Sequence, residues 1–328
     1  MTKQKLLTIW IPVLVLVLAG LLVVALLAGN DREPVEMTPT QTPTTETTLP
    51  PPTENAFTPL DFGYEGDYLT CLTAPRMLGV DVSSYQRDVD WEKAKEAGVE
   101  FAMLRAGFRG YGQSGVLKED SMVRTNYEKA TAAGLRVGVY FFSQATSVEE
   151  AQEEANFLLE IIGDWELSMP VAYDWECLAD DYRTVGVDSR TVTDCAVAFC
   201  EIMEEAGFNA MVYFNPSQSR TDMHLEELVD YGFWLAMYSE SMNYAYQVDM
   251  WQYTNQGDVP GIKGKADINL YFPSEEELAK EEQAEDAEQT EEVTGEETGE
   301  ETEEETGEET KPSEETKPAA ETEATTKE

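Results

Sequence analysis

Short apolar runs alternate with segments of helical period through residues 76–273. The runs predict eight strands: Met77–Val82, Phe101–Ala106, Val137–Phe142, Val171–Trp175, Ala210–Phe214, Phe233–Tyr238, Met250–Tyr253 and Ile268–Tyr271. The helical segments are fewer: Trp91–Ala97, Ser121–Ala133, Val148–Ile162 and Thr191–Ala206. Continuous apolar strands that alternate with helices indicate a parallel sheet covered by helices. We therefore predict an α/β fold, an irregular eight-stranded (β/α) barrel with fewer helices than strands.

A long apolar segment precedes this region. At about 1.5 Å per residue, Leu6–Ala28 reaches across a bilayer core of about 30 Å. Lys3 and Lys5 precede it, so residues 1–5 are expected in the cytoplasm and the rest of the chain outside. A cleaved signal peptide is the alternative, but the run is long for one and lacks a good cleavage site. We expect a single-pass anchor at residues 6–28, with secretion if the segment is cleaved.

Two segments of biased composition flank residues 76–273. Residues 29–75 begin rich in Thr and Pro, which predicts an extended linker outside the membrane. Residues 274–328 hold 24 acidic and 4 basic residues, with repeats of Gly-Glu-Glu-Thr. A block of like charge with few apolar residues predicts a disordered tail.

Charge narrows the classes of function. The net charge is −43, and residues 76–273 alone hold 33 acidic against 15 basic residues. Such a surface repels phosphate backbones, so we expect no nucleic-acid partner. His224 is the only histidine and no C-x-x-C pair occurs, which argues against a zinc site and a Ser-His-Asp triad. We expect no metal, no cofactor, a monomer, and chemistry carried by carboxylates.

Acidic residues stand where several predicted strands end. Asp81 closes the first strand, Asp174 and Glu176 close the fourth, and Asp267 precedes the last. In such barrels, reactive groups gather at the C-terminal ends of the strands. Asp174 and Glu176 share one face because they are two residues apart. Glycoside hydrolysis needs an acid and a second negative group whose pKa values differ, which this pair can supply.

The predicted strands also carry a series of motifs in a fixed order. They are GVDVSSYQ at 79–86, VDW at 89–91, LRAG at 104–107, GLRVGVY at 134–140, VAYDWE at 171–176, FWLAMY at 233–238, WQY at 251–253, VPGI at 259–262 and ADIN at 266–269. In this order they resemble the lysozymes of glycoside hydrolase family 25 across Met77–Phe272. One difference is that Phe141 follows Tyr140, where many relatives have a histidine.

The resemblance implies an irregular eight-stranded barrel that hydrolyses the β-1,4 bond from N-acetylmuramic acid to N-acetylglucosamine in peptidoglycan. It places the general acid at Glu176, and Asp174, Asp81 and Asp267 around the cleft. It also implies retention of configuration, with the 2-acetamido group of the substrate as nucleophile and Asp174 orienting it.

Aromatic residues and one arginine are candidates for sugar contacts. They are Tyr85, Arg105, Tyr140, Tyr213, Trp234, Tyr238 and Trp251. The alternative is that strand aromatics fill the core and that Arg105 only caps its strand. We favour the cleft for Tyr140 and Trp251, and the core for Trp175.

The four cysteines, Cys71, Cys177, Cys195 and Cys200, allow up to two disulfides in three connectivities. Cys177 alternates away from Glu176, which favours a buried thiol or a disulfide to the helix of Cys195 and Cys200.

Two other functions stay open at this stage. One is a catalytically inactive peptidoglycan-binding protein on the same fold. The other is a glycosidase that acts on chitin-like polymers, which the Asp-Trp-Glu pair alone does not distinguish from a muramidase.

Overall fold

The structure, a computed structural model, describes residues 49–177, 182–280 and 282–283 of the chain. The chain divides into two compact units, 1–49 and 50–328, and the fold described below belongs to the second. The predicted membrane anchor and most of the acidic tail lie outside the described residues. Within the described part, none of the helices has the length and apolar character needed to span a bilayer.

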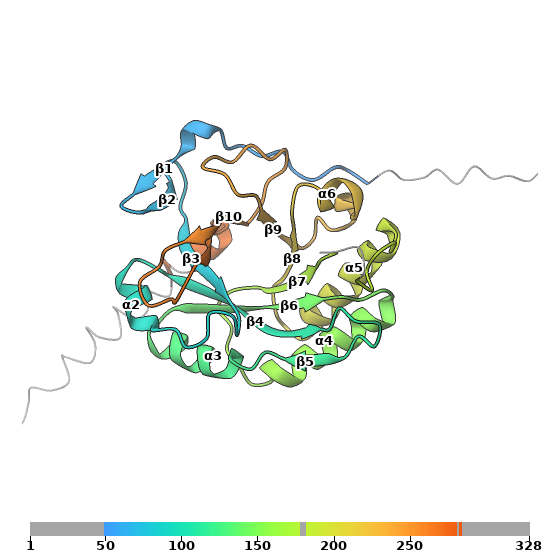
Figure 1. Cartoon of the computed structure of the whole chain (residues 1–328). Coiled ribbons are helices and arrows are strands. Elements are labelled where there is room, and N and C mark those ends of the chain that lie inside the picture. Colours follow the sequence, from blue (N-terminus) through green and yellow to red (C-terminus); the bar gives the residue numbers. More distant parts are fainter. Residues whose placement is uncertain (1–48, 178–181, 281, 284–328) are drawn as a thin grey trace, which may run out of the picture. The chain divides into compact units, whose positions relative to one another are not determined.

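Eight strands close into a barrel (Figure 1). They are β3 (Met77–Val82), β4 (Phe101–Arg109), β6 (Arg136–Ser143), β7 (Val171–Trp175), β8 (Ala210–Phe214), β9 (Gly232–Ala236), β10 (Met250–Gly257) and β11 (Ala266–Tyr271). The pairing of β3 with β4 closes the ring. Neighbouring strands are parallel except β11, which runs antiparallel to both β10 and β3. The predicted α/β barrel of eight strands is confirmed.

Four helices cover the outside of the barrel along β3 to β8 (Figure 1). They are α2 (Trp91–Glu96), α3 (Val123–Ala132), α4 (Val148–Ile162) and α5 (Ser189–Glu205). Two of them begin with a polar cap: the side chain of Ser147 accepts the N–H of Glu150, and Asp188 accepts that of Thr191. Between β8 and β9 the chain forms two short helical turns, α6 (Gln218–Thr221) and η2 (Leu225–Glu227). A three-residue strand, β5 (Leu117–Glu119), extends the sheet from β4.

Apolar side chains fill most of the interior of the barrel. Its cluster of buried side chains contains five methionines together with Phe101, Trp234 and Tyr271. Two glycines make room for these large groups. A Cβ on Gly79 would lie 2.3 Å from the ring of Phe101, and one on Gly138 would lie 2.5 Å from the carbonyl oxygen of Pro170. The apolar layers therefore fill the barrel and leave only the open end for polar side chains.

A β-hairpin packs against the outside of β10. It consists of β1 (Phe62–Glu65) and β2 (Tyr68–Cys71), and it follows the one-turn helix η1 (Pro59–Asp61). Phe62 packs edge-on against Trp251, with ring centroids 5.1 Å apart, and the backbone N–H of Leu69 donates to the hydroxyl of Tyr253. Hydrogen bonds between residues 53–55 and the loop at 244–247 also attach the preceding segment.

The sequence pattern did not predict this hairpin, which lies within the range expected to be linker. Its strands have four residues each, too few to show a period, and only the barrel supplies the surface that buries them. At the other end, residues 275–280 are helical within the range expected to be disordered tail. Glu277 accepts a 2.6 Å hydrogen bond from the hydroxyl of Tyr271 there.

Candidate active site

The four predicted carboxylates meet at one end of the barrel. Asp81 and Asp174 stand at the C-terminal ends of β3 and β7, and Glu176 follows β7 directly. Asp267 stands at the start of β11, which is antiparallel, so its start lies at the same end. They lie close enough that, in addition to burial, the charge of Asp81 raises the pKa of each of the other three.

Asp174 and Glu176 form a coupled pair. Burial raises the pKa of Asp174 well above its usual range, and the neighbouring charges of Glu176 and Asp81 add to this effect. Burial likewise raises the pKa of Glu176 to about 7, while a hydrogen bond with Asp174 opposes the rise. Burial and mutual repulsion therefore both favour the protonated form of these carboxyl groups. Among the described residues, Oδ1 of Asp174 is buried and has no hydrogen-bond partner.

Asp81 is held by two amides. Its Oδ2 accepts hydrogen bonds from Nε2 of Gln252 at 2.7 Å and from Nδ2 of Asn269 at 2.9 Å. Burial raises the pKa of Asp81 to about 6, and these two donors limit the rise. The amides therefore fix the orientation of this carboxylate and favour its ionised form.

The end of β7 is fixed through its carbonyl groups. Nε2 of Gln218 donates to the carbonyl oxygen of Trp175 at 2.7 Å. The carbonyl of Glu176 accepts from Nε2 of Gln144 at 2.5 Å and from the hydroxyl of Thr184 at 3.3 Å. Because the strand ends here, side chains supply the donors that a neighbouring strand would otherwise give.

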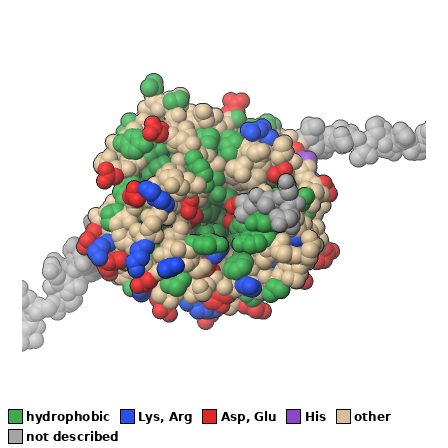
Figure 2. All heavy atoms as spheres, in the orientation of Figure 1, with side chains coloured by type: hydrophobic (Ala, Val, Ile, Leu, Met, Phe, Trp, Pro, Cys, Tyr) green, Lys and Arg blue, Asp and Glu red, His purple; other side chains and the backbone are tan. Residues whose placement is uncertain are grey.

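Three tyrosines stand around the carboxylates. The hydroxyls of Tyr213 and Tyr238 donate to Oε1 of Gln252 at 3.2 and 3.1 Å. Tyr140 is half-buried, and burial followed by the charge of Asp81 raises its pKa well above the usual range. The face in view in Figure 2 is hollowed near its centre, where hydrophobic and acidic side chains lie side by side. Carboxylates beside tyrosine rings suit a neutral, hydroxyl-rich ligand such as a sugar.

The sequence profile of the glycosyl hydrolases family 25 matches residues 80–262, more than half of the chain. The chain belongs to this family.

Individual relatives agree with this assignment. The chain is 27% identical to the autolytic lysozyme of Clostridium acetobutylicum over 196 residues, which are 60% of this chain and 56% of the relative. The modular autolysin LytC of Streptococcus pneumoniae has a TM-score of 0.53 and 26% identity, covering 60% of this chain and 47% of its own. The lysozyme of Streptomyces coelicolor shares the fold with a TM-score of 0.51 at 22% identity, over 61% and 93% of the two chains. The chain thus spans about half the length of the first two.

Two tryptophans expected at the cleft of this family 25 barrel do not reach it. Trp251 is fully buried and packs outward against Phe62, with its indole N–H donating to the carbonyl of Met237. Trp234 is 1% exposed and lies inside the barrel, with the rings of Tyr140 and Tyr213 edge-on to it. Neither side chain is therefore exposed for sugar contact in this structure, and for Trp234 the core was the alternative that the sequence left open. Trp175, expected in the core, is buried there.

Strand alternation explains the error at Trp251 and identifies residues that were missed. Gln252 is the neighbour of Trp251 and so points to the opposite face, into the barrel. Asn269 is two residues from Asp267 and shares its face. Gln252 and Asn269 both lie within the family 25 motifs WQY and ADIN. Because side chains alternate between the two faces of a strand, the sequence could have predicted that both amides face the interior of the barrel. Phe141 points away from Tyr140 into the outer core, so its side chain does not contact the cleft.

Arg105 and Tyr85 stand at the rim. The guanidinium of Arg105 forms an ion pair with Asp120, with an N–O distance of 2.7 Å. It does not pair with a cleft carboxylate, although its charge lowers the pKa of Asp174. The ring of Tyr85 is 74% exposed and lies 5.2 Å from the guanidinium carbon. Tyr111, which the sequence analysis missed, shares a hydrogen bond with Tyr85.

The cysteines are free thiols. Cys71, Cys195 and Cys200 are buried, whereas Cys177 is exposed. The expectation that Cys177 is buried or bonded to the helix of Cys195 and Cys200 was wrong. The chain leaves the strand after Trp175, so strand alternation no longer sets the direction of this side chain.

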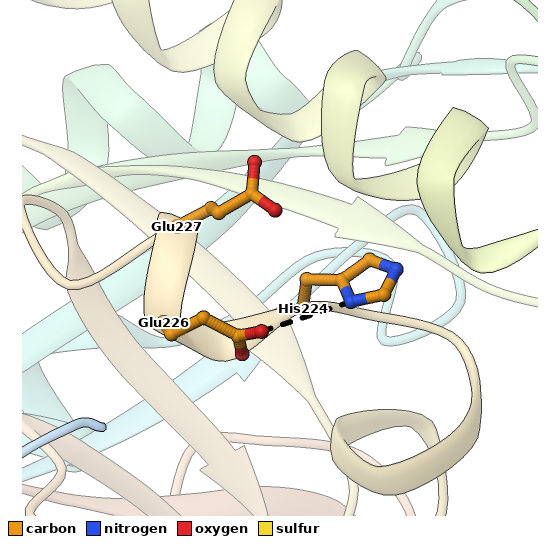
Figure 3. A group of neighbouring side chains, drawn as sticks. All are labelled: His224, Glu226 and Glu227. Carbon is orange, nitrogen blue, oxygen red and sulfur yellow. Dashed lines mark ion pairs between the residues drawn. The ribbon is translucent and has the colours of Figure 1, made fainter. Parts of the chain in front are cut away.

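One group in the described part of the chain has the spacing of a metal site. The ligand atoms of His224, Glu226 and Glu227 lie within 4.8 Å of one another (Figure 3). Glu227 forms an ion pair with Arg190 at 2.5 Å, and Nε2 of His224 lies 3.0 Å from the hydroxyl of Ser189. These protein contacts account for the arrangement without an ion.

Proposed function

We propose that the chain is a muramidase that hydrolyses the β-1,4 bond between N-acetylmuramic acid and N-acetylglucosamine in peptidoglycan. The observation that carries the proposal is the coupled pair Asp174 and Glu176 at the mouth of a family 25 barrel. The relatives support the substrate class, since one is named an autolytic lysozyme and another an autolysin.

In this mechanism, Glu176 protonates the glycosidic oxygen as the bond to C1 breaks. Its pKa of about 7 keeps the proton available near neutral pH. The carbonyl oxygen of the substrate's own 2-acetamido group attacks C1, which gives a cyclic oxazolinium intermediate. Glu176, now a carboxylate, then takes a proton from the water that opens the ring, and the product keeps its β configuration.

We assign Asp174 the role of orienting the acetamide group of the substrate. Its buried Oδ1 lacks a partner among the described residues and can accept the acetamide N–H. Since Asp174 and Glu176 belong to one strand end, they approach the sugar from the same side. This arrangement suits an acid beside an orienting group better than an acid opposite a nucleophile.

We further propose that the chain acts outside the membrane, anchored through Leu6–Ala28. This rests on the apolar run and the preceding lysines. External protease on intact cells should reach the barrel and spare residues 1–5, whereas a mature protein that begins near Asn30 would show cleavage.

Digestion of purified peptidoglycan by the full chain tests the activity. Mass spectrometry should find new reducing ends on N-acetylmuramic acid. Reducing ends on N-acetylglucosamine, or equal cleavage of chitin oligomers, would overturn the proposed specificity, and binding without any new ends would indicate an inactive binding protein.

A further inference from the structure

A groove of ≈ 680 Å³ runs between the hairpin β1–β2 and the end of β10. It contains none of the four carboxylates of the active site. Its hairpin wall, which carries Tyr64 and Tyr68, lies outside the residues 80–262 that match the family. The groove is therefore partly built from a segment outside the residues that match the family.

Tyrosine rings and polar side chains line this groove together. Tyr64 and Tyr238 are 57% and 55% exposed, while Tyr253 is buried below them. The hydroxyl of Tyr64 donates to Oε1 of Glu240 at 3.2 Å and joins the two walls. Exposed rings beside hydrogen-bonding groups offer an apolar face and a polar edge, which matches a pyranose ring.

Tyr238 connects the groove to the active site. Its ring lines the groove, and its hydroxyl donates to Gln252, the residue that holds Asp81. Tyr238 therefore borders both the groove and the hydrogen-bond network that holds Asp81.

The charge of the groove favours sugar over peptide. Asp67, Glu240 and Asp258 line it, and of the three only Asp258 has an ion pair among the described contacts, with Lys265. Negatively charged walls disfavour the binding of carboxylates. The stem peptides of peptidoglycan carry several carboxylates. The N-acetylglucosamine rings of the strand carry no carboxylate and meet no such penalty.

We infer that this groove is an additional binding site for the glycan strand, through which the enzyme prefers long strands. The inference rests on the proposed function. Tyr64 supplies a stacking surface for a sugar several positions from the bond that is cut.

Binding is measured first, so that the test does not depend on turnover. Calorimetry measures the binding of peptide-free glycan strands to full-length protein that carries Glu176→Gln. One set of strands has four sugars, and the other has ten or more. Adding Tyr64→Ala should weaken binding of the long strands about 3- to 10-fold, as expected for loss of one stacked ring, and leave the short strands unchanged. Tyr64→Phe should keep most of the affinity. Leu60→Ala is the matched control, since Leu60 is 88% exposed in the same segment and does not line the groove.

Turnover by the otherwise wild-type chain should follow the same pattern in kcat/KM. Equal losses on short and long strands, or a loss that appears only when stem peptides are present, would overturn the inference. Long strands that bind through Tyr64 without being cut would instead contradict the proposed function alone.

Discussion

Asp267 on β11 lies directly opposite Asp81 on β3, across an antiparallel pair of strands. Side chains in such positions have Cβ atoms about 5 Å apart, and like charges there destabilise a sheet. Burial, followed by the charge of Asp81, raises the pKa of Asp267 to about 8. The barrel therefore keeps two carboxyl groups on opposing positions of neighbouring strands and favours a proton on Asp267.

Asp267→Asn should stabilise the protein at alkaline pH. A carboxyl whose pKa is higher in the folded state gives stability that is complete below the unfolded pKa of about 4 and is lost as pH rises through the folded value. For Asp267 this loss extends up to about pH 8. The variant should therefore gain melting temperature relative to wild type, and this gain should increase from pH 4 to pH 9. The exposed control Asp164→Asn should show no such trend, and a difference independent of pH would contradict the assignment.

Glu176→Gln should fold normally and lose activity about 10²- to 10⁴-fold, as for removal of a general acid. The half-buried amide is close to isosteric, so the melting temperature should change little. Steady-state release of reducing ends measures the loss. Turnover near that of wild type in the folded variant would exclude Glu176 as the acid.

Asp81→Asn should move the alkaline limb of the pH–activity profile to lower pH. The negative charge of Asp81 raises the pKa of Glu176, which stands at about 7. Without that charge, Glu176 loses its proton at lower pH, so kcat/KM should begin to fall earlier. The residual activity of the variant is followed from pH 5 to pH 9. A limb that stays in place or moves upward would show that Asp81 does not act on Glu176 through its charge.

Phe62→Ala should destabilise the protein by about 3 kcal/mol, in the range for buried aromatic residues. Phe62 is 8% exposed and packs on Trp251, Phe57 and Phe272. Chemical denaturation measures the change in free energy of unfolding. The neighbouring Leu60→Ala should change it by less than about 0.5 kcal/mol. Equal effects of the two variants would mean that the hairpin contributes no packing to the barrel.

The sequence by itself determined the eight strands, the four main helices and the meeting of three carboxylates. Each buried strand needs a continuous apolar run, and barrel geometry brings the C-terminal ends of parallel strands together, so Asp81, Asp174 and Glu176 were predictable from order alone. Asp267 precedes its strand and reaches the same end only because β11 runs antiparallel, which the predicted parallel sheet did not include.

The tertiary structure decided which side of each strand faces the cleft and what lies around it. The register and the packing of the hairpin turned Trp251 outward and Gln252 inward, because neighbouring residues of a strand point to opposite faces. The donors at Asp81 come from β10 and β11, and those at the end of β7 from separate loops. The groove beside Tyr64 likewise exists only where the hairpin meets β10, since neither segment forms a concave surface alone.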